Sequence, residues 1–163
     1  MILILMGVSG SGKTTVGKAL AADLGWPFYD ADDFHPPENV AKMAQGIPLT
    51  DADRAPWLAR LRDLIIGMLA EGRNGVLACS ALKQGYRDQL RVDPDQVRFV
   101  YLKGDYETIR WRMEARPDHY MHADMLRSQF DALEEPTDAL TLAVDQPAED
   151  IVRQIKDALR LDR

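Results

Sequence analysis

The sequence predicts an α/β domain of three layers, in which helices cover both faces of a five-stranded parallel sheet. Three observations support this fold class. Short apolar runs alternate with helical patterns along the chain, as expected of parallel strands joined by crossover helices. The first apolar run, at 2–6, leads directly into a glycine-rich turn and a helix start. The length of 163 residues suits one core, so we expect a single domain over 1–163.

Each element is assigned from its local pattern of apolar residues. Gly25 is the expected C-cap of the first helix, and Pro56 is the expected first residue of a long helix, because proline suits that position. Trp57 and Trp111 lie in helical apolar stripes, so we predict both in the core. The expected strands are at 2–6, 28–29, 76–79, 97–102 and 140–144, and further helices are expected at 38–45, 86–91, 105–114, 123–133 and after Pro147.

The composition excludes several classes of function. A net charge of −6 leaves no excess of lysine or arginine to neutralise phosphates, which argues against a nucleic-acid partner. The apolar run at 2–6 is too short to span a membrane and has no basic residues before it. The single cysteine, Cys79, cannot form an internal disulfide and fits a reducing compartment. We therefore expect a cytoplasmic protein without nucleic-acid or membrane partners.

The glycine-rich turn matches the pattern G-x-x-x-x-G-K-[ST] at all four fixed positions. Its glycines let the backbone curl around an anion, and the following helix directs its positive dipole end to the same point. Lys13 can reach the β- and γ-phosphates, and the Thr14 hydroxyl can ligate Mg²⁺. The motif predicts a nucleoside triphosphate but not the phosphoryl acceptor. The expected contacts are Gly7, Val8, Ser9, Gly10, Ser11, Gly12, Lys13, Thr14 and Thr15.

Two carboxylates follow the second expected strand. Asp30 and Asp32 are two residues apart at its carboxyl end, so their side chains point to the same side, at the edge where open α/β sheets bind ligands. One carboxylate can orient Mg²⁺ through water, while the other accepts a hydrogen bond from the acceptor hydroxyl. The alternative is a solvated acidic turn that caps a helix. We favour the functional interpretation because the phosphate loop is present. The strand at 76–79 carries no aspartate to hold the metal, which adds weight to Asp30 and Asp32.

Cationic side chains follow other strand ends or lie in the segments that should cover them. A cluster there would suit a carboxylate or phosphate on the acceptor, although each residue is of a kind usually found solvated. The candidates are His35, Arg54, Lys83 and Arg87.

Arg112 and Arg116 are four residues apart on an expected helix. They either close over the triphosphate and neutralise the transferring group, or form a pair of exposed arginines that face acidic residues. Gln129 belongs to the buried face of a later helix or reaches a sugar hydroxyl. We expect a lid at about 112–125 and substrate-binding helices at about 34–70.

Longer blocks of sequence resemble the gluconokinase family, from the first strand to about Gln146. They are more specific than the phosphate loop, which many unrelated enzymes share. The blocks are Asp30-Ala-Asp32-x-x-His35, Lys42-Met43-x-x-Gly46-x-Pro48-Leu49-x-Asp51-x-Asp53-Arg54-x-Pro56-Trp57-Leu58, Cys79-Ser80-Ala81-Leu82-Lys83-x-x-Tyr86-Arg87-Asp88, Tyr101-Leu102-x-Gly104 and Ser128-Gln129-Phe130-x-x-Leu133-Glu134-x-Pro136.

The resemblance implies a P-loop kinase fold like that of shikimate and nucleoside monophosphate kinases, and ATP-dependent phosphorylation of the 6-hydroxyl of D-gluconate to 6-phospho-D-gluconate. It also implies Mg²⁺ and a possible homodimer. In the implied site, Lys13, Asp32 and Arg116 are catalytic, Thr14 and Asp30 hold Mg²⁺, Arg112 and Arg116 belong to the lid, and Asp32, His35, Arg54, Lys83, Arg87 and Gln129 contact the sugar acid.

Some alternatives stay open at this point. Asp33 stands where the family carries an apolar residue, so any of Asp30, Asp32 and Asp33 can face the acceptor hydroxyl. The chain can be a kinase for another small acceptor, such as shikimate or a nucleoside monophosphate. It can also be a nucleotide-binding switch, although it lacks an Asn-Lys-x-Asp sequence for reading guanine, or a structural domain with a decayed loop.

Overall fold

The computed structural model describes residues 1–115 and 123–161. Its centre is a five-stranded sheet in the order β2-β3-β1-β4-β5, in which every neighbouring pair is parallel. The predicted fold class is confirmed, and the strand ends differ from the predicted ones by at most one residue. The strands are β1 (Ile2–Met6), β2 (Phe28–Asp30), β3 (Gly75–Ala78), β4 (Val97–Lys103) and β5 (Leu140–Ala143).

The first strand, β1, lies in the middle of the sheet. Ile2 pairs with Gly75 of β3 on one side and with Val97 of β4 on the other. All five residues of β1 are buried, as expected of a continuously apolar strand with both faces covered. Because all five strands run in the same direction, their carboxyl ends meet at one edge, and the loop after β1 lies in the middle of that edge.

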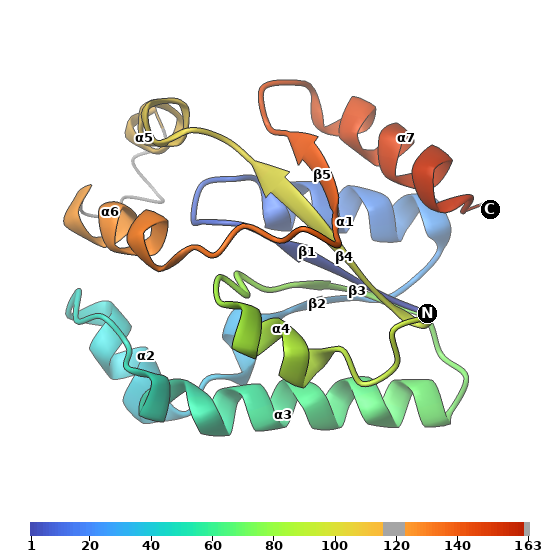
Figure 1. Cartoon of the computed structure of the whole chain (residues 1–163), viewed down its shortest axis with the longest axis horizontal. Coiled ribbons are helices and arrows are strands. Elements are labelled where there is room, and N and C mark those ends of the chain that lie inside the picture. The colour runs from blue at the N-terminus through green and yellow to red at the C-terminus, as the bar shows by residue number, and fades with distance from the viewer. Residues whose placement is uncertain (116–122, 162–163) are drawn as a thin grey trace.

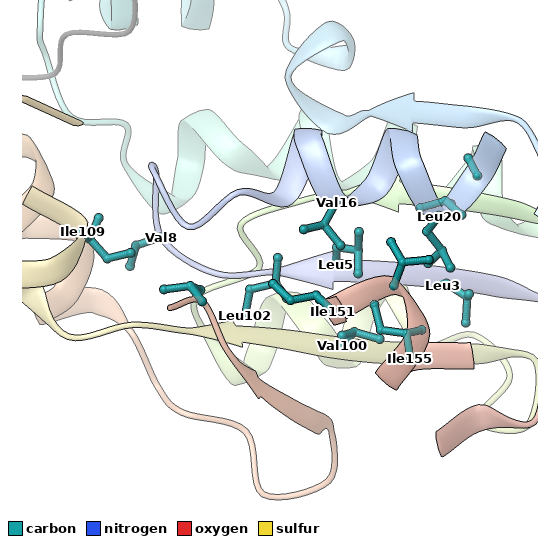
Figure 2. Close-up of a cluster of buried hydrophobic side chains, with 14 of the residues drawn as sticks. Leu3, Leu5, Val8, Val16, Leu20, Val100, Leu102, Ile109, Ile151 and Ile155 are labelled. Atoms are coloured by element: carbon teal, nitrogen blue, oxygen red, sulfur yellow. The ribbon is translucent and has the colours of Figure 1, made fainter. Parts of the chain in front are cut away.

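Helices cover both faces of the sheet (Figure 1). On one side lie α1 (Lys13–Leu24) and α7 (Ala148–Leu159), and on the other lie α3 (Asp51–Ala70) and α4 (Gln84–Leu90). Leu3 and Leu5 pack toward α1 and α7, whereas the alternate residues of β1 pack toward α3 and α4. Figure 2 shows the first of these clusters, which includes Val16, Leu20, Val100, Leu102, Ile151 and Ile155.

The remaining helices lie at one end of the molecule (Figure 1). A short 3-10 helix, η1 (Ala31–Phe34), follows β2 directly and is succeeded by α2 (Pro37–Ala44). After β4 comes α5 (Tyr106–Glu114), and α6 (Ala123–Ala132) precedes β5. The expected lid at 112–125 falls partly outside the described residues. No helix within the described ranges is long and apolar enough to cross a membrane.

The long helix α3 begins five residues before Pro56, so the predicted helix start was wrong. The start is set by a capping box: the Thr50 hydroxyl accepts a hydrogen bond from the Asp53 backbone N–H, and the Asp53 carboxylate accepts one from the Thr50 backbone N–H. Pro56 is therefore inside the second turn. Residues 51–55 become helical, which brings Arg54 onto the same rigid element as Trp57.

Trp111 was also predicted wrongly as a core residue. Its side chain is on the outer face of α5, and the residue is 71% exposed. Ile109 and Met113 take the buried face of this helix instead. Trp57, in contrast, is buried as predicted, and its indole Nε1–H donates to the Ala31 carbonyl at 2.7 Å.

Candidate active site

The loop after β1 forms a tight curl at the carboxyl edge of the sheet. Gly10 and Gly12 have φ angles of +81° and +95°, which favour glycine. A Cβ on Gly10 would lie 2.7 Å from Cγ of Met113, so α5 presses directly on the curl. Gly12 is the N-cap of α1 and has no side chain to cap the first-turn amide groups, which leaves them for an anion.

Lys13 begins α1 and folds back over the curl. Its Nζ donates to the carbonyls of Gly7 at 3.0 Å and Val8 at 3.1 Å. Burial lowers the pKa of Lys13, and the nearby charges of Asp32 and Asp30 partly oppose that shift. A cation held in poorly solvated surroundings interacts strongly with an incoming anion, because little water screens it.

Two residues from distant elements contact the same curl. The Gln129 side chain, on α6, accepts a hydrogen bond from the Ser9 backbone N–H at 2.7 Å and donates one to the Ser9 hydroxyl at 3.0 Å. Arg112, on α5, donates to the Val144 carbonyl, and its Nη2 comes within 3.6 Å of a Cβ built on Gly12. Arg112 therefore lies beside the phosphate loop, while Gln129 contacts the loop itself.

The carboxylates after β2 lie beside Lys13. Asp30 accepts a hydrogen bond from the Asp32 backbone N–H at 3.0 Å and so caps η1. Although the Asp32 side chain is 78% exposed, the walls of the site displace enough surrounding water to raise its pKa. The charge of Asp30 raises this pKa further, while Lys13 opposes it. Of the three aspartates here, Asp32 and Asp30 are the ones whose charges act on Lys13.

On the far side of these carboxylates, His35 and Arg54 come together. His35 is buried and stacks on the Trp57 indole, with ring centroids 4.4 Å apart and planes 12° from parallel. Its Nε2 lies 3.9 Å from Oδ1 of Asp32. Burial, with a smaller effect from Arg54, lowers the pKa of His35 to about 4, so the imidazole is neutral at pH 7.

Arg54 and Lys83 are joined by two residues that the sequence did not single out as site residues. Arg54 donates to the Tyr86 hydroxyl at 3.2 Å, and that hydroxyl donates to the Asp51 carboxylate. Lys83 donates to the same carboxylate at 3.0 Å. Tyr86 belongs to one of the blocks quoted above, but its spacing from Asp51 across 35 residues gave no signal that they meet.

Arg87 has a different environment from the one expected. It is only 1% exposed, and its guanidinium donates to four acceptors of the protein itself. Three of these are backbone carbonyls, of Ala81, Leu82 and Glu134, and the fourth is the Gln84 side chain. These contacts tie the segments after β3 and α6 together, so we assign Arg87 to the structure of the site rather than to the substrate.

Replacing Arg87 with leucine should therefore affect stability more than substrate binding. We expect the free energy of unfolding to fall by about 3 kcal/mol, because buried carbonyls lose a charged donor. Chemical denaturation measures this loss, and Arg62→Leu is the control, since Arg62 is exposed and donates to the Gln89 carbonyl. A stable Arg87→Leu variant with a strongly raised KM for the acceptor would contradict the assignment.

The described residues support neither a metal site made of protein ligands alone nor a reactive cysteine. No group of three or more His, Cys, Asp or Glu side chains within 1–115 and 123–161 is arranged to hold a metal ion by itself. Cys79 is buried, and burial raises the pKa of its thiol to about 12, so it stays protonated. Arg116, His119 and His122 lie outside the described residues.

The residues of the curl fit the phosphates of a nucleotide. The positive-φ glycines form a cradle that side chains would fill, and the buried Ser11 hydroxyl has no hydrogen-bond partner among the described residues. Thr14 and Thr15 are exposed at the start of α1. The loop therefore offers backbone N–H groups, a lysine ammonium and hydroxyls to one anion.

Comparison with known proteins identifies the family. A family model described as shikimate kinase matches residues 9–160. The thermosensitive gluconokinase of Escherichia coli (strain K12) is 53% identical over 133 residues, which cover 82% of this chain and 71% of that protein. The chain belongs to the gluconokinase family.

A solved structure supports the same family. The gluconokinase from Sinorhizobium meliloti 1021 is 43% identical and superposes with a TM-score of 0.88, covering 97% of this chain and 90% of that one. The shikimate kinase from Bacteroides thetaiotaomicron is 22% identical with a TM-score of 0.68, which shows a shared fold alone. As a member of the gluconokinase family, the chain is a phosphotransferase and uses ATP, and shikimate kinases are distant relatives.

Proposed function

We propose that the protein transfers the γ-phosphoryl group of ATP to the 6-hydroxyl of D-gluconate, giving 6-phospho-D-gluconate and ADP. One observation carries the proposal. The phosphate loop with Lys13, the carboxylates of Asp30 and Asp32, and the cations of Arg54 and Lys83 meet at one edge of the sheet. A phosphoryl donor, a proton acceptor and a site for a carboxylate are the three parts that phosphorylation of a sugar acid needs.

On the donor side, the residues of the loop position the triphosphate. Backbone N–H groups of residues 7–12, the Lys13 ammonium and Arg112 neutralise charge on the phosphates. We propose Thr14 and Asp30 as the contacts to Mg²⁺, which when bound neutralises charge on the β- and γ-phosphates. Arg116 remains a proposed third cation of this site.

On the acceptor side, Asp32 takes the proton of the attacking hydroxyl. Its exposed carboxylate is beside Lys13 and 3.9 Å from His35, so a hydroxyl held here lies between the phosphate loop and the acceptor pocket. Arg54 and Lys83 bind the carboxylate end of gluconate, because both are cations tethered through the Tyr86–Asp51 pair. Gln129 contributes by holding Ser9 of the loop.

The proposal is tested by measuring 6-phosphogluconate formation from ATP and gluconate, with a dehydrogenase that reduces NADP⁺ as it consumes the product. The same assay of ATP consumption with shikimate and with AMP separates gluconate from the acceptors of related folds. We expect turnover with gluconate to exceed turnover with either by at least about a hundredfold. Equal turnover without any acceptor would instead favour a nucleotide switch.

Arg54→Ala should weaken binding of the acid much more than that of ATP. The loss of a charged hydrogen bond predicts a KM for gluconate raised about tenfold to a hundredfold, with the KM for ATP within about twofold. Arg60→Ala is the matched control on the same helix, since Arg60 is exposed and donates to the Phe34 carbonyl. An unchanged KM for gluconate would remove Arg54 from the acceptor site.

Three further expectations accompany the proposal. Mg²⁺ dependence is tested by removing the metal with a chelator and restoring it. Light scattering during gel filtration tests the homodimer, and fractionation of cells that produce the protein tests the cytoplasmic location.

A further inference from the structure

The imidazole of His35 is held in a fixed orientation. His35 follows η1, and its side chain is only 4% exposed. One face of the ring stacks on the Trp57 indole, and Trp57 is itself fixed by its hydrogen bond to the Ala31 carbonyl. With the plane set by packing, the remaining variable is which ring nitrogen carries the proton.

The Asn39 side chain determines which nitrogen of the His35 ring carries the proton. Asn39 is buried on α2, and its Nδ2 lies 2.8 Å from the Asp53 carbonyl oxygen and 3.1 Å from Nδ1 of His35. A carbonyl oxygen can only accept, so the NH₂ end of the amide must face Asp53. The second hydrogen of that NH₂ group then meets Nδ1, which must accept it and therefore carries no proton in the neutral ring.

The proton of the neutral ring is consequently on Nε2. The groups facing the ring are Asp32 from η1, Arg54 and Trp57 from α3, and Asn39 from α2. The 3.9 Å between Nε2 and the Asp32 carboxylate is too long for a direct hydrogen bond. A hydroxyl oxygen at about 2.8 Å from both atoms fits that gap and can accept from Nε2–H while donating to Asp32.

We propose that Asn39 is a positioning residue, which keeps His35 in the Nε2–H form so that the ring directs the proton of an acceptor hydroxyl toward Asp32. The inference rests on the proposed function, because the hydroxyl belongs to the acceptor. With the proton on Nδ1 instead, Nε2 would accept from the hydroxyl and turn its hydrogen away from the carboxylate. Asn39 thereby acts on the reaction without touching the acceptor.

The first test observes the tautomer of His35 directly in the wild-type chain. In the full chain labelled with ¹⁵N-histidine, long-range ¹H–¹⁵N spectra at pH 7.5 distinguish a protonated ring nitrogen from an unprotonated one, and His35→Gln assigns the His35 signals. We expect Nε2 protonated and Nδ1 unprotonated without any ligand. The reverse pattern would overturn the proposal, and because no turnover is involved, it would leave the proposed function untouched.

The second test is a double-mutant cycle between Asn39→Asp and His35→Phe. Asn39→Asp replaces the donor with an acceptor, so the proton should move to Nδ1, and kcat with gluconate should fall about tenfold while the KM for ATP stays unchanged. Phenylalanine at position 35 keeps a ring against Trp57 but has no nitrogen whose protonation Asn39 could set, so Asn39→Asp should then change kcat by less than about twofold. An equal fall in both backgrounds would show that Asn39 acts independently of His35 and would overturn the proposal.

Discussion

Lys13→Ala is expected to lower gluconate-dependent ATP turnover by about a thousandfold, the size of effect seen when a main charge-stabilising group is removed. The ammonium of Lys13 is already held over the curl by the Gly7 and Val8 carbonyls. Its lowered pKa reflects the poor solvation of the charge in this position. The triphosphate adds to the negative charge that Asp32 and Asp30 already provide there, and its interaction with Lys13 is strongest when charge develops on the transferring group.

Loss of activity in this variant should not come from unfolding. A lysine whose pKa is lower in the folded chain than in the unfolded one destabilises the fold at neutral pH, so its removal should leave the melting temperature unchanged or raise it. Lys18→Ala is the control on the same helix, since Lys18 is exposed and lies over the Phe28 ring. If Lys13→Ala retained a tenth of the wild-type turnover, the role of the loop in catalysis would be wrong.

Asp32→Asn is expected to lower kcat by about a hundredfold to ten-thousandfold, the usual contribution of a general base, with a smaller change in the KM for gluconate. The asparagine keeps the shape of the side chain but accepts no proton. Asp33→Asn is the matched control, because Asp33 is an exposed neighbour in the same turn and should change kcat by about twofold or less. If Asp33→Asn lowered kcat strongly and Asp32→Asn did not, the role of proton acceptor would belong to Asp33.

The raised pKa of Asp32 adds a dependence on pH. Activity should decline with acid as pH falls through the raised pKa, above the ordinary aspartate value of 3.8, because the protonated carboxyl cannot accept. The pH dependence of stability runs the other way. Because the folded chain favours the protonated form of Asp32, the ionised carboxylate lowers stability, and this loss is complete above the raised pKa. Asp32→Asn should therefore melt at a higher temperature than wild type at pH 7, and the two should converge below about pH 3.8.

Local patterns predicted the parts of the site that lie within single turns. The phosphate loop and the position of Asp30 and Asp32 after the second strand follow from glycine spacing, apolar runs and the geometry of parallel sheets. The roles of Arg54 and His35 came from the family resemblance. The start of α3 was missed because Pro56 was given more weight than the Thr50–Asp53 capping box, although both are visible in the sequence.

The parts of the site that were not predicted depend on contacts between residues far apart in the sequence. Arg87 has the sequence context of a substrate ligand, but its carbonyl partners lie up to 47 residues away, and no pattern in the sequence reports them. Asn39 looks like an ordinary polar residue of a short helix until the Asp53 carbonyl and His35 are seen on either side of its amide. Trp111 was misassigned because α5 has apolar residues on more than one face, and Ile109 and Met113 take the buried one.

The central position of β1 has a consequence for how the chain is made. Ile2–Met6 is synthesised well before its hydrogen-bonding neighbours, which include Gly75 of β3 and Tyr101 of β4. Until β3 has been synthesised this apolar segment has neither partner strand, and until β4 follows it keeps one unpaired edge, which exposes the nascent chain to aggregation. The nucleotide-binding turn that follows β1 therefore takes its final shape only after β4, which ends at Lys103, has been synthesised.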